Sequence, residues 1–454
     1  MLICTCALAG ALVGFLAGLI PGLHMNNIAA LLSAYAGVSV GLFSGVSDIL
    51  GSESPGLAIS SFLSAALIAH TISESIPSTY MGIPSGDTVS VLPAHRLARC
   101  GLGRSAVRAS ADGAFAGTLA AAIALIPMSF LMGAPINFYD MLRMSMGAIV
   151  VLFSCILLFS EAFRTIGRRK EKAMRVLRGA LIFFASGLLG WIVLKTDFYA
   201  SPLPDIPWGQ HGFVPREALL LPLFAGLFGV PSLLLSLGSR QVWDIRPGSP
   251  CVDIHSPNRK DIVLSLLGGA IVGWMPGMTS GSAATLCMPA ARETVRASDI
   301  PSSLRFIWLY SSISGAGGVF ALGALFTIAR TRSGTMDSIE MFLGSGLENS
   351  VWPSNLALML ELATAMLFSA VFSHSVLRLL DRRIRVVRNL MGSNAVTVAA
   401  LTFILSLAFA LTGLRGAVVT ASSVSLGLLT PLLGVRRIQL MGCLLVPIAA
   451  SFLG

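Results

Sequence analysis

Apolar runs long enough to cross a lipid bilayer recur along the whole chain, with short polar segments between them. A helix needs about 20 mainly apolar residues to span the hydrocarbon core of a bilayer. On that criterion the pattern predicts membrane helices, or halves of such helices, over residues 3–20, 27–46, 57–75, 109–133, 144–163, 179–195, 217–237, 261–291, 304–329, 355–376, 395–412, 417–433 and 438–453. The predicted fold class is therefore an all-α polytopic membrane protein.

Two of these runs are interrupted by a Pro-Gly pair. Residues 14–31 read GFLAGLIPGLHMNNIAAL and break at Pro21 and Gly22, while residues 269–286 read GAIVGWMPGMTSGSAATL and break at Pro276 and Gly277. Proline removes a backbone donor and clashes with the preceding turn, and glycine adopts backbone angles that other residues avoid. Each run is therefore predicted to split into two half-helices, the alternative being that the pairs only kink two packed helices.

The two interrupted runs also match each other in sequence. The residues Gly14, Gly18, Pro21 and Gly22 recur at one constant offset as Gly269, Gly273, Pro276 and Gly277. Self-similarity of this kind indicates an internal repeat. We therefore expect residues 1–238 to form a first membrane repeat, 239–260 a cytoplasmic linker, and 261–454 a second membrane repeat.

The charges in the loops predict that the two repeats are inverted. Residues 47–56 carry two acidic residues and no basic one, which favours the outside of the membrane, whereas basic residues flank the second break on both sides. The first broken or re-entrant helix hairpin would then enter from outside and the second from inside. Secondary transporters with inverted repeats place their substrate near the bilayer midplane between such broken helices.

The composition agrees with a membrane protein and narrows its chemistry. Hydrophobic residues make up 55% of the chain and charged residues 11%, against about 25% charged residues in soluble domains. The net charge of +10 is spread over short loops, so membrane topology explains it better than nucleic acid does. Seven cysteines without metal-binding or paired spacing, and the absence of H-E-x-x-H and G-x-S-x-G motifs, predict neither a metal site nor an enzyme.

The interrupted helices are the predicted substrate site. A half-helix that begins inside the membrane presents unpaired N–H groups and a positive dipole end, which attract anions. Small residues at 279–282 also suit close helix packing, which remains the alternative for each of them. The predicted substrate-binding residues are Pro21, Gly22, Leu23, His24, Asn26, Asn27, Ser78, Thr79, Pro276, Gly277, Thr279, Ser280, Gly281 and Ser282.

A second unusual stretch, residues 73–106, contains three prolines, several glycines and many hydroxyls. Such irregular backbone is tolerated at membrane depth only where protein or a water-filled cavity covers it, and a carboxylate there is a candidate cation ligand or proton carrier. The predicted coupling residues are Glu74, Ser85, Asp87, Thr88, Ser314 and Gly315. A helix N-cap explains Asp87 equally well. Glu361 is a further intramembrane acid, and we expect His70 and His374 to be structural.

The quoted motifs together resemble the TctA family, the large membrane subunit of tripartite tricarboxylate transporters, in its archaeal-type stand-alone form. That family carries G-x-x-P-G near its N-terminus and then an I-P-G-type stretch that ends in D-G-Y-P-M-A-x-x-G-x-x-x-x-A-L. Residues 93–98, followed by Gly101 and Ala106, look like the last part of that stretch, and residues 273–277 fit a second G-x-x-P-G. The sequence departs at residues 24–27, where the usual loop has smaller residues, and at His95-Arg96 in place of Met-Ala. These departures concern the substrate more than the fold.

The resemblance implies a cation-coupled permease of the cell membrane for citrate-like or other carboxylates. Its implied partners are a small anionic substrate and the lipid bilayer and, as open alternatives, a second copy of the chain or a small membrane subunit with an extracytoplasmic binding protein. We expect no cofactor, and sodium or a proton as the coupling ion. The alternative function is a flippase for polyprenyl-phosphate lipids, because an anionic headgroup would also suit paired re-entrant loops.

Overall fold

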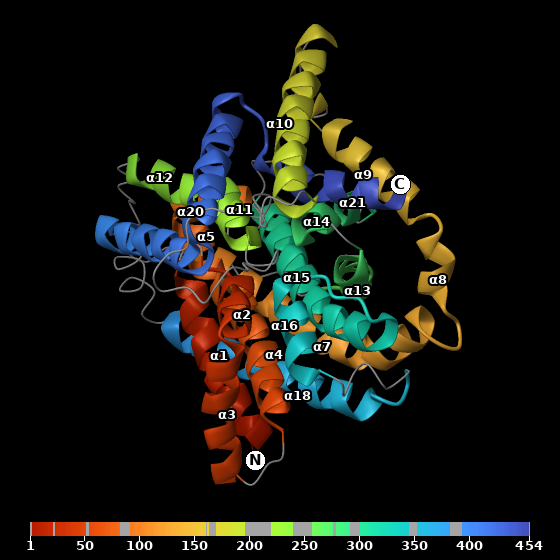
Figure 1. The fold of residues 1–454 in the computed structure, drawn as a ribbon. Helices are drawn as coiled ribbons and strands as arrows, with labels where there is room; N and C mark the ends of the chain where they lie inside the picture. Colours follow the sequence, from red (N-terminus) through yellow and green to blue (C-terminus); the bar gives the residue numbers. More distant parts are fainter. Residues whose placement is uncertain are drawn as a thin grey trace. The chain divides into compact units, whose positions relative to one another are not determined.

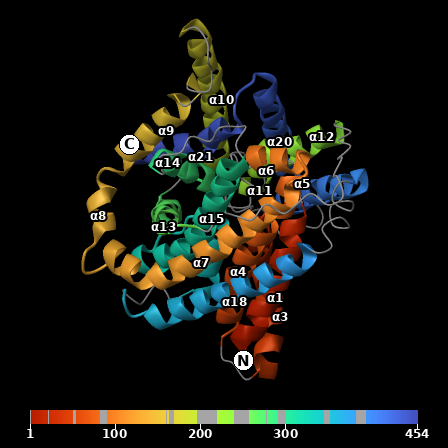
Figure 2. The ribbon, with the colours of Figure 1, turned by 180° about the vertical axis from the view of Figure 1, so that it is seen from behind.

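The computed structural model describes residues 2–20, 23–50, 54–81, 91–159, 161–162, 169–195, 219–238, 257–275, 278–290, 300–344, 352–381 and 393–453 (Figures 1 and 2). The helices in chain order are α1 (Leu2–Leu19), α2 (Met25–Ala34), α3 (Ala36–Leu50), α4 (Pro55–Ser73), α5 (Ser75–Met81), α6 (Val91–Arg99), α7 (Gly103–Met132), α8 (Phe138–Arg143), α9 (Met146–Phe159), α10 (Arg169–Lys195), α11 (Leu220–Phe224), the π-helix η4 (Ala225–Gly229), α12 (Val230–Gly238), α13 (Arg259–Trp274), α14 (Ser280–Ala290), α15 (Ile300–Ile328), α16 (Gly334–Leu343), α18 (Leu356–Asp381), α20 (Asn394–Leu432), the 3-10 helix η5 (Arg437–Met441) and α21 (Gly442–Leu453).

Six of the described helical segments are long and apolar enough to cross a membrane: Pro55–Tyr80, Gly103–Met132, Arg169–Leu194, Ile300–Ile328, Leu356–Leu380 and Asn394–Leu432. The described residues contain helices and no strand. The prediction of an all-α, multi-pass membrane protein is therefore confirmed.

The chain divides into two compact units, and each half of the chain contributes one segment to both. The first unit comprises Met1–Tyr139 and Ser239–Thr397, and the second comprises Asp140–Gly238 and Val398–Gly454. Both Pro-Gly breaks fall in the first unit. These units do not coincide with the predicted repeats, so the repeat boundaries at 238 and 261 stay a prediction.

In the first unit, α1 packs parallel to α4, and glycines form the contact face of α1. Gly10, Gly14 and Gly18 lie against Phe62, Ala66 and His70 in register. A Cβ added at Gly14 would lie 2.2 Å from the carbonyl oxygen of Ala66. Glycine is therefore required here, because the two backbones touch.

The half-helix before the second break is packed in the same way. The helix α13 runs parallel to α15, with Gly269 against Ala316 and Gly273 against Phe320. At the start of both helices, Arg305 Nη2 lies 2.6 Å from Asp261 Oδ1. Each half-helix that leads into a Pro-Gly pair thus lies along the long helix that follows its hairpin.

Helices α7, α15 and α18 complete the core of this unit (Figure 2). Backbone contacts of Gly113 and Gly117 with α15 bring α7 and α15 close together. The helix α18 runs antiparallel to α7, since Met359 contacts Ser129 while His374 and Arg378 contact Asp112. His374 Nε2 lies 2.8 Å from Asp112 Oδ1, so this histidine has a side-chain partner within the helix packing.

Three local features differ from the sequence prediction. Residues 27–46 were expected to be one run, but α2 and α3 meet at Tyr35 with a bend of 92°, where the Ser39 hydroxyl donates to the Leu32 carbonyl at 2.9 Å. Residues 169–178 lie outside the predicted runs but form the first part of α10, because Arg, Lys, Glu, Ala and Met are good helix formers. The helix α16 was not predicted, and the Ser333 hydroxyl caps it by accepting the Met336 N–H.

The second unit contains α9–α12, most of α20 and α21. The two runs predicted at 395–412 and 417–433 both lie in α20, which is interrupted between them by a kink at Gly413, whose φ of 61° lies in the left-handed region that glycine favours. Glu161 is buried and accepts from Arg436 Nε at 2.9 Å and from Gln439 Nε2 at 3.4 Å. This ion pair joins the end of α9 to η5.

Candidate functional site

The first break lies between α1 and α2, and its Pro21 and Gly22 fall outside the described residues. His24 caps α2, since its Nδ1 accepts the N–H of Asn26 at 3.3 Å. The carbonyl of Leu23 accepts a hydrogen bond from His70 Nε2 at 2.8 Å, and both Leu23 and Asn27 are buried. A side chain of α4 therefore holds the backbone of the break.

His70 and Glu74 form a titratable pair beside this break. A carbonyl oxygen can only accept, so the Nε2 of His70 carries a hydrogen. The other ring nitrogen, Nδ1, lies 3.5 Å from Glu74 Oε2. The ring of His24 lies 5.2 Å from that of His70, centroid to centroid. Two imidazoles and one carboxylate thus gather where α1 ends and α2 begins.

The second break lies between α13 and α14, with Pro276 and Gly277 again outside the described residues. The Thr279 hydroxyl accepts the N–H of Ser282 at 3.2 Å and lies 2.9 Å from the Ser282 hydroxyl. Ser280 is the first residue of α14, and Gly281 and Ser282 are buried. This break presents hydroxyls and the N-terminal N–H groups of an 11-residue helix.

One short segment between α15 and α16 contacts both breaks. The guanidinium of Arg332 donates to the Met278 carbonyl, which directly precedes Thr279. Three residues later, the N–H and hydroxyl of Thr335 donate to Asn26 Oδ1 at 3.2 and 3.0 Å. Residues 332–335 therefore contact both predicted half-sites.

The helices on either side of this contact are also joined. The Ser33 hydroxyl of α2 donates to the Ser338 hydroxyl of α16 at 2.8 Å. Figure 1 shows α2 beside α16, and the two helices are in contact. The position of Asn26 is thus fixed by α16 at two points one helical turn or more apart.

The remaining predicted site residues are more dispersed. Ser78 and Thr79 lie on α5, where the Ser78 hydroxyl donates to the Ser75 carbonyl and the Thr79 carbonyl accepts from His95 Nδ1. Ser314 and Gly315 lie within α15, and a Cβ at Gly315 would lie 2.4 Å from the Ala114 carbonyl oxygen of α7. The predicted coupling residues Ser85, Asp87 and Thr88 lie outside the described residues.

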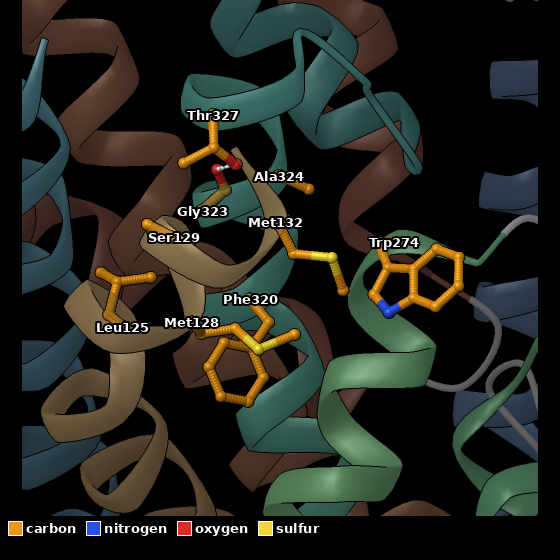
Figure 3. Close-up of a pocket in the computed structure, with 9 residues that line it drawn as sticks. All are labelled: Leu125, Met128, Ser129, Met132, Trp274, Phe320, Gly323, Ala324 and Thr327. Carbon is orange, nitrogen blue, oxygen red and sulfur yellow. Dashed lines mark hydrogen bonds between the residues drawn. The ribbon is translucent and has the colours of Figure 1, made fainter. Parts of the chain in front are cut away.

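A separate pocket lies among α7, α13 and α15, near the second break (Figure 3). Its lining is apolar apart from the indole N–H of Trp274 and two hydroxyls, which are bonded to the Gly323 carbonyl and to the Met359 sulfur. It is lined by Leu125, Met128, Ser129, Met132, Trp274, Phe320, Gly323, Ala324 and Thr327. With no charged residue in its lining, it does not suit a carboxylate.

The sequence prediction missed Arg332 and Thr335, and it assigned His70 a structural role. A basic residue directly after an apolar run reads as part of a solvent-facing loop, and nothing local in the sequence links it to residues 278 and 26. His70 had a usable signal, because it precedes Glu74 by four residues and therefore lies on the same helical face.

Comparison with known proteins agrees with the membrane architecture. A family model described as "Tripartite tricarboxylate transporter TctA family" matches residues 4–442. A protein of Methanocaldococcus jannaschii, described as uncharacterised, is 26% identical over 337 residues, which cover 73% of this chain and 71% of that protein. No solved structure matches the chain. Since the family model spans nearly the whole chain, the protein belongs to the tripartite tricarboxylate transporter TctA family.

Proposed function

We propose that the protein is a secondary active permease that moves organic carboxylate anions, such as citrate-like tricarboxylates, across the cell membrane. Membership of the TctA family supports a permease of the tricarboxylate-transporter type. The observation that carries the finer proposal is the segment of residues 332–335, which is hydrogen-bonded to both interrupted helices. A site built from both breaks receives donors from two elements that can move relative to each other.

Alternating access would follow from an inverted repeat, and the directions of the helices support one. The start of α4 at Gly56 contacts Phe342 at the C-terminal end of α16, the helix that follows α15. Beyond the other end of α4 and α5, Arg96 donates to Ser303 at the start of α15. The helix α4 is therefore antiparallel to α15, and the parallel partners α1 and α13 are opposed in the same way. Rocking of one such repeat against the other is the usual route to alternating access.

We assign cation coupling to Glu74 together with His70. Glu74 Oε2 lies 3.5 Å from His70 Nδ1, and His70 Nε2 also donates to the Leu23 carbonyl at the first break. A cation gained or lost by this pair changes the charge next to the same break that carries Asn26. Binding of the cation and of the anion would then be linked through that break.

The family description names a tripartite system, in which other proteins assist the permease. We propose two arrangements for this chain: a stand-alone permease, or a permease assisted by a small membrane subunit and an extracytoplasmic binding protein. Co-purification of the chain with such subunits, compared with uptake by the chain alone, tests this part of the proposal.

Uptake by the purified protein tests the function directly. Proteoliposomes would be supplied with radiolabelled citrate under an inward sodium gradient, an inward proton gradient or no gradient, beside a scrambling assay with labelled polyprenyl phosphate. We expect citrate uptake that depends on one of the two cation gradients. Absence of carboxylate uptake under every gradient, together with movement of the labelled lipid phosphate, would replace the permease by a flippase.

A further inference from the structure

We propose that Arg332 binds a carboxylate group of the transported anion, with the Asn26 amide and the N-terminus of α14 as its neighbouring donors. This inference rests on the proposed function and adds to it the residue that recognises the substrate charge. It concerns a side chain that the sequence pattern did not single out.

No negatively charged group in the described part of the chain balances the charge of Arg332. The residue is partly buried, and its Nε is buried without a hydrogen-bond partner among the described residues. The bond that the structure gives its guanidinium goes to the neutral Met278 carbonyl. No described carboxylate lies within the 4.0 Å of an ion pair with it, although such pairs hold Asp261, Asp112 and Glu161. A buried cation without a counter-charge is costly, and a bound anion would remove that cost.

The neighbouring groups are arranged to donate as well. Both hydrogen bonds from Thr335 fall on Asn26 Oδ1. The amide oxygen is thereby occupied, which leaves the NH₂ group of Asn26 as a donor. Near the other end of the segment, α14 begins at Ser280, two residues after Met278, and its first N–H groups carry the positive end of the helix dipole.

The chemistry of these donors favours a carboxylate. A guanidinium presents parallel N–H groups that match the two oxygens of a planar carboxylate. The fixed positive charge of Arg332 balances one carboxylate group of the anion, and the neutral amide and hydroxyl donors add hydrogen bonds to its oxygens.

Two substitutions and one matched control test this assignment. Arg332→Gln removes the charge, and Arg332→Lys keeps the charge but loses the planar pair of donors. Arg330→Gln is the control, because Arg330 is exposed and carries the same charge in the same loop. Each variant would be reconstituted in nanodiscs, checked for its melting temperature, and titrated with citrate and, separately, with inorganic phosphate; uptake of citrate would be measured in proteoliposomes.

We expect Arg332→Gln to weaken citrate binding at least tenfold, Arg332→Lys to weaken it several-fold, and Arg330→Gln to leave it unchanged. Since Arg332→Lys keeps the charge, it provides the decisive measurement if Arg332→Gln does not fold. Wild-type affinity for citrate in both Arg332 variants would overturn the inference. If Arg332→Gln does not fold, wild-type affinity in Arg332→Lys would overturn it. In either case, citrate uptake by the wild-type protein would still support the proposed function. A wild type that neither binds nor transports a carboxylate would overturn the function and the inference together. Tighter binding of phosphate than of citrate, lost in Arg332→Gln, would overturn the carboxylate assignment.

Discussion

The two interrupted helices share one backbone design and differ in their chemistry. In both, a glycine-lined half-helix lies parallel to the long helix that follows its hairpin. The first break gathers two imidazoles and a carboxylate, namely those of His24, His70 and Glu74. The second presents the hydroxyls of residues 279, 280 and 282 beside the guanidinium of Arg332. On the proposed function, the first break would serve the cation and the second the anion.

The two half-helices are similarly constrained by their packing. A Cβ at Gly14 would meet the backbone oxygen of Ala66 at 2.2 Å, while a Cβ at Gly269 would meet the Cβ of Ala316 at 2.5 Å. The Cβ of alanine is bonded directly to the backbone, so neither contact is relieved without shifting a long helix. Close approach of the two helices thus requires glycine at both positions.

The largest expected effect comes from removing this glycine contact. Gly14→Ala should destabilise the protein by about 2–3 kcal/mol through overpacking, and Gly269→Ala by a similar amount. The measurement is the unfolding midpoint in a denaturing detergent titration. Gly41→Ala is the control, because a Cβ there meets nothing within 4 Å and alanine favours a helix over glycine by roughly 0.5–1 kcal/mol. A wild-type midpoint in Gly14→Ala or in Gly269→Ala would contradict the close packing at that glycine.

The next effect tests whether the first break carries the cation. Glu74→Gln removes the carboxylate that faces His70 Nδ1, so citrate uptake should no longer respond to a proton or sodium gradient while downhill exchange of citrate persists. Uptake with and without each gradient measures this. Glu171→Gln, which removes an exposed acid from α10, is the control. Loss of coupling in Glu361→Gln, with normal coupling in Glu74→Gln, would move the cation site to α18.

A smaller effect is expected for the contact that joins the two breaks. Asn26→Ala removes both the amide donors and the acceptor for Thr335, and should raise the KM for citrate about tenfold, since a hydrogen bond to a charged group contributes about 1.5–3 kcal/mol. Thr335→Val keeps the backbone N–H and removes only the hydroxyl, so its KM should rise less. A larger effect of Thr335→Val than of Asn26→Ala would show that the contact only supports the fold.

The smallest effect is expected at the second break. Ser280→Ala removes one hydroxyl at the start of α14 and should weaken citrate uptake several-fold, corresponding to about 1 kcal/mol for one neutral hydrogen bond. Ser44→Ala is the control, because that exposed hydroxyl bonds within α3, to the Val40 carbonyl. Both Asn26→Ala and Ser280→Ala should still insert into the membrane, and normal uptake by both would place the site elsewhere.

Much of the fold followed from the sequence because its causes are local. The length of the apolar runs predicted the helices confirmed as candidate spans, and the Pro-Gly pairs marked the ends of α1 and α13. Short-range detail was harder to predict. The bend at Tyr35 and the helix α16 depend on single side chains, Ser39 and Ser333, that complete backbone hydrogen bonds. A hydropathy pattern does not register such capping interactions.

The sequence by itself determined an all-α membrane protein with two similar interruptions, because hydropathy, proline and glycine act on the segment in which they occur. Only the tertiary structure decided which distant side chains contact those interruptions. Asn26 and Thr335 are 309 positions apart, and Arg332 reaches Met278 across 54. A polar side chain after an apolar run has the same local pattern whether it faces water or a buried carbonyl. The distinction depends on which helices pack together, and that is a property of the folded chain.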